Sequence, residues 1–351
     1  MILVALTAAL ASCATPTRTQ IESPSLAACR TAVAPGGNPS PDQIRWIRPE
    51  APAERSTLDD WCRSVGPAIV AAAPPLSDSD AEPSGLVVIS WNVNVGAGDV
   101  ATLVASLRDG TLTGQPVSRF VLLLQEAFRE GELVPRGPLP GAESAGAIRP
   151  RVAGRDRIDI ISAAAKLGLA LYYVPSMRNG DPDKTDEDRG NAILSTEPLS
   201  DLAAIELPFE RQRRVAIEAT ITGGGPPIRV TNVHLDNRAP ARRLWLFSVA
   251  TRLRQARGLL RGMAADGPAI LGGDFNTWYG FHDPVFAEVS ESLAPPATGD
   301  GRPTFGIMRL DHLFFRLPDG WRASTIRLDT YGSDHHPLLA TVGPSSPRGS
   351  R

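Results

Sequence analysis

The feature of this sequence that most constrains its fold is a set of short apolar runs that each end in carboxylate, amide or imidazole side chains. Residues 121–124 lead directly into Gln125 and Glu126, and residues 270–273 lead into Asp274. A carboxylate buried at the end of a strand is unfavourable unless it is paired or bound to a metal. Six strand ends of this kind therefore indicate that the fold brings them to one shared site. The polar residues at these ends are Asn92 and Asn94; Gln125 and Glu126; His234, Asp236 and Asn237; Asp274 and Asn276; Asp311 and His312; and Asp334, His335 and His336.

Short runs rich in leucine and β-branched residues predict many strands in the part of the chain after Gly85. Helical patterns lie between some of them, most clearly at residues 242–263, where apolar residues recur every three or four positions. Strands interspersed with helices favour layered sheets covered by helices. The predicted strands occupy residues 86–90, 120–126, 169–175, 191–195, 214–221, 228–234, 268–274, 310–315 and 337–342.

The composition excludes two classes of protein. The 351 residues are 42% hydrophobic and 21% charged, which is typical of a globular chain and not of a disordered one. No internal apolar run reaches the roughly 20 residues that a membrane-spanning helix needs. The formal net charge of -2 is a poor match for indiscriminate binding to duplex nucleic acid, although a local basic groove stays open as an alternative.

The N-terminus resembles a bacterial lipoprotein signal peptide. Residues 1–11 are small or apolar and lead through Ser12 to Cys13, which would carry the lipid after cleavage. We therefore expect residues 1–12 to be a signal peptide, and the protein to be exported as a cell-envelope lipoprotein or a secreted protein. The basic residues that normally precede such an apolar segment are absent. Their absence suggests a start further upstream, or an ordinary apolar N-terminal segment.

Export gives Cys29 and Cys62 an oxidising environment in which a disulfide is stable. The two residues lie 33 positions apart in a proline-rich stretch, and a disulfide there would stabilise the fold by roughly 3 to 4 kcal/mol. Two buried free thiols are the alternative. A zinc site is disfavoured because there is no CxxC pair and no nearby histidine.

The chain is predicted to contain one large domain and a poorly structured N-terminal part. Residues 13–84, rich in alanine, proline and serine, are predicted to be an extension and linker with a single helical pattern at 56–70. The composition changes after Gly85, and residues 85–342 are predicted to form the domain. Residues 343–351 are predicted to be a disordered tail.

The donor types at the strand ends indicate a hard divalent cation. Glu126, Asp274, Asp334 and the asparagine side chains offer oxygen atoms, and no thiolate lies near them in sequence. Such a set suits Mg²⁺, and also Mn²⁺ or Ca²⁺, better than zinc. A cation of this kind grips phosphate oxygens, and nearby histidines provide groups that titrate near neutral pH. The residues alone therefore favour hydrolysis of a phosphoester.

At these residues the sequence closely resembles the endonuclease/exonuclease/phosphatase superfamily, the DNase I-like fold. The resemblance covers residues 85–342 and implies an α+β fold, a four-layer α/β/β/α sandwich in which helices flank two packed mixed sheets. Each motif alone is weak, but all seven occur in the order of the family. They are Ser90-Trp91-Asn92-Val93-Asn94, Leu124-Gln125-Glu126, Gly190-Asn191-Ala192-Ile193-Leu194-Ser195, Val233-His234-Leu235-Asp236, Gly273-Asp274-Phe275-Asn276, Arg309-Leu310-Asp311 and Gly332-Ser333-Asp334-His335.

The resemblance also implies a role for each matching residue. Asn92 and Glu126 correspond to the pair that holds the metal ion, with Glu126 as the direct ligand, and Asp334 to a second acidic residue that approaches the metal. Asp274 and Asn276 correspond to the residues that position or deprotonate the attacking water and contact the phosphate. The remaining three matches are His335, the catalytic histidine; Asp311, its carboxylate partner, which orients the imidazole; and His234, which stabilises the transition state or protonates the leaving oxygen.

One position departs from a branch of the family. Asn94 stands where abasic-site endonucleases have aspartate, so a second metal would be held less firmly there. The presence of His234 also points away from that repair branch.

The leading interpretation is an extracytoplasmic, Mg²⁺-dependent nuclease in which water attacks the phosphodiester directly. A lipid or small-molecule phosphoesterase, of the sphingomyelinase or inositol-phosphatase type, stays open as an alternative. So does a non-catalytic envelope adaptor that keeps the fold. We expect a monomer, nucleic acid rather than lipid as the partner, no organic cofactor, and membrane contact only through a lipidated Cys13.

Some residues near the motifs have two interpretations. His312 and His336 are expected to be structural, because strand alternation would turn them away from the site. Arg213 and Arg214 could grip phosphate or begin a solvated strand. Trp278, Tyr279 and Phe281 could stack on bases or touch lipid, although packing is the favoured role.

Overall fold

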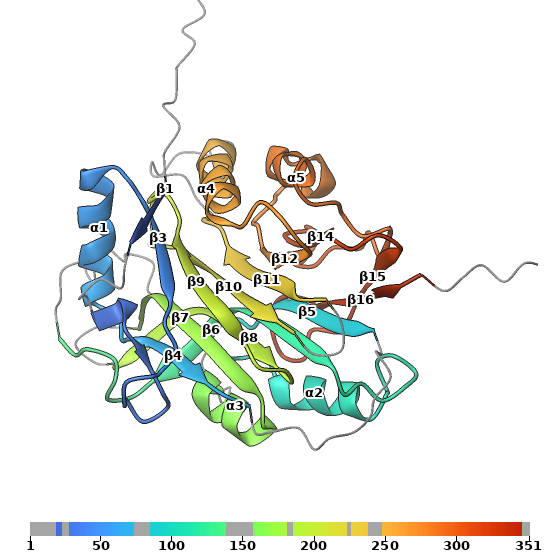
Figure 1. The fold of residues 1–351 in the computed structure, drawn as a ribbon, viewed down its shortest axis with the longest axis horizontal. Coiled ribbons are helices and arrows are strands. Elements are labelled where there is room, and N and C mark those ends of the chain that lie inside the picture. Colours follow the sequence, from blue (N-terminus) through green and yellow to red (C-terminus); the bar gives the residue numbers. More distant parts are fainter. Residues whose placement is uncertain are drawn as a thin grey trace, which may run out of the picture.

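Two β-sheets packed face to face form the centre of the molecule, with helices on both outer faces (Figure 1). The computed structural model describes residues 19–22, 28–73, 85–137, 157–180, 185–222, 226–237 and 248–345. The predicted signal peptide, Cys13 and most of the predicted tail lie outside the described residues. In the part of the chain that is described, no helix is both long enough and apolar enough to cross a membrane.

The first sheet has seven strands, and the three neighbouring strands at one edge of it carry polar strand ends. Neighbouring strands β11 and β12 are parallel, whereas β12 and β14 are antiparallel. In spatial order the strands are β1 (Thr19–Glu22), β3 (Arg45–Pro49), β9 (Ser200–Glu206), β10 (Val215–Ile221), β11 (Ile228–His234), β12 (Ala269–Asp274) and β14 (Asp311–Arg316).

The second sheet has nine strands, and its central pair β5 and β6 is parallel. In spatial order the strands are β13 (Thr298–Gly299), β15 (Trp321–Arg327), β16 (Leu338–Pro344), β5 (Leu86–Asn92), β6 (Phe120–Glu130), β8 (Glu187–Ser195), β7 (Ala170–Asn179), β4 (Ala68–Ala71) and β2 (Ala32–Val33).

Three apolar layers hold the four structural layers together. Val88, Leu123 and Ile270 belong to the core between the sheets. Helices α2 (Val100–Arg108) and α3 (Ile160–Leu167) cover the outer face of the nine-stranded sheet. Helices α4 (Ser248–Gly262) and α5 (Pro284–Ser290) cover the outer face of the seven-stranded sheet (Figure 1). The predicted α+β, DNase I-like α/β/β/α sandwich is confirmed.

The central strands are continuous apolar runs because both of their faces are covered. In β6, Val121 and Leu123 face the other sheet, whereas Leu122 and Leu124 pack under the helices. The helix ends follow local sequence signals. Asp99 caps α2 by accepting a hydrogen bond from the Thr102 backbone N at 2.9 Å.

Strands β7 and β8 extend further than their apolar runs predict. Most of the added residues are charged or polar, and their side chains are buried. The two carboxylates are paired: Asp188 accepts from Arg129 Nε at 3.0 Å, and Glu187 pairs with Arg157 at 2.7 Å. A pattern based on apolar residues cannot detect a strand that is stabilised in this way. Strands β9 and β15 were also not predicted.

Part of the predicted extension, residues 13–84, contributes strands to both sheets. Strand β3 pairs with β9, and β4 pairs with β7. Helix α1 (Pro52–Arg63) begins before the predicted helical pattern at 56–70, since proline fits the first turn of a helix, and residues 68–71 are a strand instead. The boundary at residue 85 itself remains a prediction.

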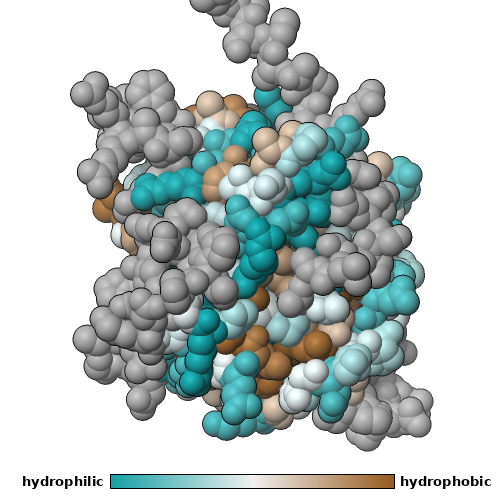
Figure 2. All heavy atoms as spheres, turned by 90° about the vertical axis from the view of Figure 1, so that its left-hand side faces the viewer, coloured by the Kyte–Doolittle hydropathy of each residue, from teal (hydrophilic) through white to brown (hydrophobic). Residues whose placement is uncertain are grey.

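Helix α1 covers one side of the molecule, at the edge where β3 lies (Figure 1). Leu58, Trp61 and Cys62 are its buried residues. Figure 2 shows this side from the front: its described surface is mainly hydrophilic, with apolar atoms gathered near the lower centre. The helix therefore presents a polar surface to solvent while its apolar residues face inward.

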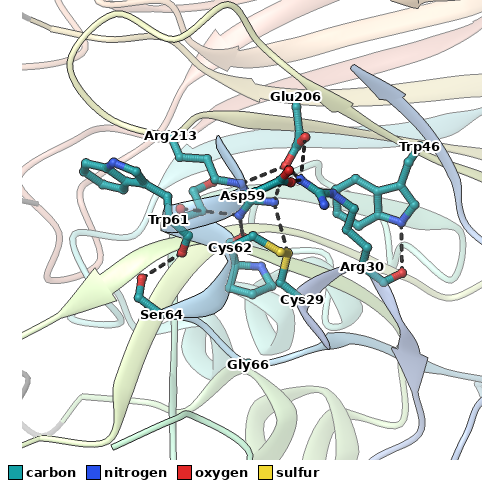
Figure 3. Close-up of a disulfide and its surroundings, with 12 residues drawn as sticks. Cys29, Arg30, Trp46, Asp59, Trp61, Cys62, Ser64, Gly66, Glu206 and Arg213 are labelled. Atoms are coloured by element: carbon teal, nitrogen blue, oxygen red, sulfur yellow. Dashed lines mark hydrogen bonds and ion pairs between the residues drawn. A yellow bond between two sulfur atoms is a disulfide. The ribbon is translucent and has the colours of Figure 1, made fainter. Parts of the chain in front are cut away.

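A disulfide joins Cys29 to Cys62, with the two Cα atoms 5.4 Å apart (Figure 3). It links η1 (Ala28–Arg30) to α1, and both cysteines are fully buried. The predicted pairing is therefore present in the structure, and the free-thiol alternative is not.

Beside the disulfide, three arginines surround the buried carboxylate of Glu206, and two of them, Arg30 and Arg213, can be seen next to it in Figure 3. Arg30 Nη2, Arg48 Nε and Arg213 Nη2 lie 3.0, 2.7 and 2.7 Å from its oxygens. Burial alone would raise the pKa of Glu206, but the guanidinium groups lower it to about 2. Arg213 is thus part of a buried ion-pair network, and neither interpretation offered for it from the sequence is correct.

We expect the disulfide to stabilise the fold. Replacing both cysteines (Cys29→Ala with Cys62→Ala) should lower the free energy of unfolding by about 3 to 4 kcal/mol, because the unfolded chain regains the entropy of an open loop. Urea unfolding with and without dithiothreitol measures the loss. The reductant should destabilise the wild type but not the double variant, and Cys13→Ala should behave as wild type. An equal effect of reductant on both proteins would contradict this prediction.

We also expect an acid-dependent loss of stability that originates at Glu206. Its folded-state pKa lies below the unfolded value of 4.5, so its contribution is present above pH 4.5 and is lost as the pH falls towards 2. The full loss corresponds to about 3 kcal/mol. Urea unfolding between pH 6 and pH 2 measures it. Glu206→Gln should flatten the dependence, whereas the exposed Glu50→Gln should not. A slope for Glu206→Gln equal to that of wild type would refute the assignment.

Candidate active site

Strand register places three of the predicted site residues side by side. His234 ends β11 and is the register partner of Asp274 at the end of β12, which in turn is the partner of Asp311 at the start of β14. All three side chains are buried. The His234 Nε2 atom lies 3.4 Å from Asp274 Oδ2. The pairing register of the seven-stranded sheet therefore brings these strand ends together, as expected from the sequence.

The second sheet contributes Asn92 across the sandwich. Asn92 ends β5, and its Nδ2 donates to Asp274 Oδ2 at 3.0 Å. Its Oδ1 accepts from the Asn94 backbone N at 3.0 Å, so both ends of the amide are held. The same carboxylate oxygen, Asp274 Oδ2, thus contacts side chains from both sheets: His234 from one and Asn92 from the other.

Glu126 is aimed by an irregularity in β6. The pairing of β6 with β8 shifts between Leu124 and Ala127, and Glu126 has φ +52°, in the left-handed region. An extra residue in a strand bends it and redirects side chains, and such bulges are frequent next to active sites. As a result Glu126 is buried and lines a cavity that it shares with His234.

His335 lies on the segment before β16 and is anchored at several points. Its Nδ1 donates to Asp311 Oδ2 at 2.8 Å, its backbone O accepts from Trp91 Nε1 at 3.1 Å, and its backbone N donates to Ser333 Oγ at 3.1 Å. The ring of Phe305 packs against it, with centroids 4.7 Å apart. The other imidazole nitrogen, Nε2, is thereby left 3.9 Å from Asp274 Oδ2.

The site carries two neighbouring buried carboxylates. Burial, followed by repulsion from Asp311, raises the pKa of Asp274 to about 7, although His335 and Asn92 act in the opposite direction. Burial would lower the pKa of His335, but Asp311 and Asp274 raise it to about 10. The arrangement therefore favours positive charge, on the imidazole or on a bound cation.

The remaining predicted site residues lie around this centre. Asn276, also at positive φ, donates its backbone N to Asp274 Oδ1 at 2.9 Å, while its Nδ2 donates to the Leu235 carbonyl at 2.9 Å. Asp334 is exposed next to His335 and contributes to its raised pKa. The structure thus brings the centre together, but the role of each residue remains a prediction.

The donor set fits a hard cation. Ligand atoms of Asp274, Asp311 and His335 lie within 4.8 Å of one another, a grouping that does not include Glu126 or Asp334. Within the described residues, Asp311 Oδ2 is hydrogen-bonded to His335, whereas its buried Oδ1 has no hydrogen-bond partner. That Glu126 and Asn92 hold the metal stays a prediction. The oxygen donors suit Mg²⁺, Mn²⁺ or Ca²⁺, and the disulfide occupies Cys29 and Cys62.

A polar bridge between the sheets supports the site from behind. Gln125 Nε2 donates to Asn232 Oδ1 at 2.7 Å, and Asn232 Nδ2 donates to the carbonyls of Leu124 and Ala192 at 2.9 Å each. Both residues are fully buried. The position of Gln125 at a strand end was visible in the sequence, but its pairing with Asn232 depends on how the two sheets stack.

One glycine is required by close packing next to the site. A β-carbon at Gly273 would lie 2.0 Å from the Val233 carbonyl oxygen. Any other residue there would push β12 away from β11 and so move Asp274 away from His234.

Other residues singled out from the sequence lie away from the centre. His312 hydrogen-bonds to Thr277 Oγ1 at 2.7 Å, and burial lowers its pKa well below the usual value. His336 Nδ1 donates to the Leu328 carbonyl at 2.7 Å. Phe281 packs against Phe286, with ring centroids 5.2 Å apart, although it stays partly exposed.

Comparison with known proteins gives one family match. The model of the "Endonuclease/Exonuclease/phosphatase family" matches residues 89–335. No curated protein matches the sequence significantly.

Several solved structures resemble parts of this one. An endonuclease/exonuclease/phosphatase from Beutenbergia cavernae DSM 12333 has 19% identity and a TM-score of 0.49, covering 76% of this chain and 74% of that chain. The human Nocturnin catalytic domain with bound sulfate anion has 20% identity and a TM-score of 0.49, covering 76% and 97%. Sphingomyelinase C from Streptomyces griseocarneus has 18% identity and a TM-score of 0.45, covering 73% and 99%.

Proposed function

Because this chain belongs to the endonuclease/exonuclease/phosphatase family, whose members are hydrolases and phosphoesterases, we propose that it is a divalent-metal-dependent phosphodiesterase that cleaves nucleic acid. The observation that carries the proposal is the arrangement around Asp274. One buried carboxylate, on β12, lies within 4 Å of two imidazoles and an amide that come from three other segments. A structural core would not need this group of titratable side chains.

Each of the four titratable side chains of the centre can take one role in hydrolysis. Asp274 accepts the proton of the attacking water, whose oxygen forms the new bond to phosphorus. Asp311 holds His335 with Nδ1 protonated, so that Nε2 points towards the reacting phosphate. The bond from phosphorus to the leaving oxygen then breaks, and His234 supplies the proton that this oxygen takes up.

Glu126, Asn92 and Asp334 are the residues that would hold the metal ion. When bound, Mg²⁺ would neutralise the charge that develops on the phosphoryl oxygens. Asn92 also contacts Asp274, so the metal ligands and the water-activating carboxylate are mechanically coupled. A shift of either group would change the position of the other.

A specific observation supports the second candidate, a lipid phosphoesterase. Ile307 is 93% exposed at the tip of a tight turn, and Phe305 in the same turn packs against His335. Tyr279 and Phe281 add partly exposed rings. An apolar rim of this kind would suit a lipid surface, so lipid substrates belong in the test.

We also propose that the protein works outside the cytoplasm as a monomer, anchored through a lipidated Cys13 or secreted. The buried disulfide supports this location, because such bonds persist in oxidising compartments. Mass spectrometry of the mature N-terminus would test it, and an intact Met1 would overturn the lipoprotein assignment.

The proposed function predicts that His335→Ala abolishes metal-dependent hydrolysis while the protein stays folded. Loss of the imidazole removes acid–base chemistry that typically accelerates such reactions 10²–10⁴-fold. The measurement is turnover of plasmid DNA, RNA, sphingomyelin, bis-p-nitrophenyl phosphate and phosphomonoesters with Mg²⁺ or Mn²⁺. Cleavage of sphingomyelin alone would select the lipid candidate.

Three controls accompany this assay. His282→Ala, which removes an exposed imidazole, should keep wild-type turnover, and a chelator should stop turnover. Glu126→Gln should require a higher metal concentration than the exposed Glu130→Gln. Undiminished turnover in His335→Ala would contradict the proposed function. Inactivity of the wild type on every substrate would favour a non-catalytic adaptor.

A further inference from the structure

A cavity of about 160 Å³, here called the edge cavity, lies where edge strand β14 of one sheet faces β15 and β16 of the other (Figure 1). Its lining includes Leu313 from β14, Thr325 from β15 and Leu338 from β16. A space of this size is about what one benzene ring needs. None of the lining residues has a part in the hydrolysis proposed above.

Much of the wall of the edge cavity is aromatic or otherwise apolar. The rings of Phe281 and Phe286 belong to it, with centroids 5.2 Å apart, and the ring of His312 lies 5.0 Å from that of Phe286. Burial lowers the pKa of His312 well below its usual value, so this ring is neutral. Pro295 and Pro296 add further apolar surface. Such a wall favours a flat, apolar group.

Two residues that line the edge cavity carry buried polar atoms without a partner. Within the described residues, neither Arg309 Nε nor Thr325 Oγ1 has a hydrogen bond. Both side chains are more than nine-tenths buried. Buried polar groups in native proteins nearly always have a partner, and each exception calls for a ligand, an ion or a water molecule. A ligand with a hydrogen-bond acceptor would satisfy both atoms, since the Thr325 hydroxyl can donate as well.

The guanidinium group of Arg309 is held in place by neutral groups. Its Nη1 donates to the backbone carbonyls of Asp300 and Arg302, at 2.5 and 2.9 Å. Its central carbon lies 4.7 Å from the centre of the Phe281 ring. These contacts fix the orientation of the group without cancelling its charge.

The nearby carboxylates leave Arg309 with uncompensated positive charge. Asp300, which also lines the edge cavity, accepts from Arg302 Nε at 2.6 Å, and Asp311 is paired with His335 at 2.8 Å. Although Asp300 and Asp311 act in the opposite direction, burial lowers the pKa of Arg309. An anionic ligand would supply the missing charge, and hydrogen bonds between a guanidinium group and a carboxylate are strong.

The free edge of β14 offers a second donor. Phe315 donates its backbone N to the Ala294 carbonyl at 2.7 Å, on the side of the strand that faces away from β12. Residues two apart in a strand direct their N–H groups to the same side. The N–H of Leu313 therefore also points away from β12, and Leu313 lines the edge cavity.

We propose that the edge cavity binds a small aromatic carboxylate, with its ring against Phe281 and Phe286 and its carboxylate on Arg309 Nε and the Leu313 N–H. The Thr325 hydroxyl donates to the same carboxylate. The apolar wall disfavours a phosphate, which is more highly charged and costs more to remove from water. This site is separate from the catalytic centre, so its test does not depend on the proposed function.

Calorimetric titration of the full chain with benzoate tests the proposal. The wild type should bind benzoate saturably, with a Kd of about 1 mM or tighter. Acetate lacks the ring and benzyl alcohol lacks the charge, so each should bind at least about 10-fold more weakly. The proposal is overturned if benzoate does not bind, or if either of the other two compounds binds as tightly.

Gly301→Leu is designed to fill the edge cavity. Within the described residues, a β-carbon at Gly301 would meet only Phe281 Cε2, at 3.8 Å, which is ordinary van der Waals contact. Gly301 also lines the edge cavity, so the added side chain takes the space of the ring. Benzoate binding should fall at least about 10-fold while the urea unfolding midpoint stays close to that of wild type.

Arg309→Lys and Thr325→Val test the polar contacts. Arg309→Lys keeps the positive charge but lacks the Nε donor, so benzoate should bind about 10-fold more weakly and benzyl alcohol as before. Thr325→Val removes the hydroxyl at nearly constant volume and should weaken benzoate binding about 3-fold.

Arg316→Lys is the matched control. Arg316 lies at the other end of β14 and, like Arg309, donates to two backbone carbonyls, those of Gly267 and Ala264. This variant should bind benzoate as the wild type does. Undiminished binding in Gly301→Leu or Arg309→Lys, or an equal loss in Arg316→Lys, would show that benzoate binds elsewhere and would overturn the proposal.

Discussion

The register of three neighbouring strands is the constraint on which the rest of the structure depends. It places His234, Asp274 and Asp311 in one row at the end of the seven-stranded sheet. Asp274 then accepts a hydrogen bond from Asn92 of the opposite sheet, and Asp311 orients His335, which lies on the segment before β16. A shift of one residue in β12 would turn Asp274 to the other face of the sheet. The core between the sheets, which specifies this register, is therefore also what assembles the site.

The N-terminal segment stabilises the opposite part of the sandwich with charge and a covalent bond. Glu206 on β9 pairs with Arg30 and Arg48 from this segment, and the disulfide fastens η1 to α1. Removing one member of a buried ion pair is far more damaging than its net contribution suggests, because its partner is left without compensation. This arrangement allows a segment of modest apolar content to extend both sheets.

The residues that line the cavity beside Glu126 come from both sheets. Arg214 precedes β10 and Arg189 lies within β8, so the two guanidinium groups come from different sheets, as do His234 and Glu126. The exposed Ile307 turn lies on the His335 side of the centre and supports the competing lipid function.

The sequence by itself determined the fold family and which polar residues stand at the ends of the converging strands, because apolar runs that end in carboxylates and imidazoles are a local pattern. Tertiary structure alone decided the rest. The bulge that redirects Glu126, the pairing of Gln125 with Asn232 and the burial of Arg213 against Glu206 all depend on residues far apart in the chain. The extended ends of β7 and β8 contain charged residues that resemble a loop in sequence, and only their partners Arg129 and Arg157 make them strands. The physical reason is that hydrophobic periodicity reports which face of an element is buried, whereas the partner of a buried polar group is set by how the layers stack.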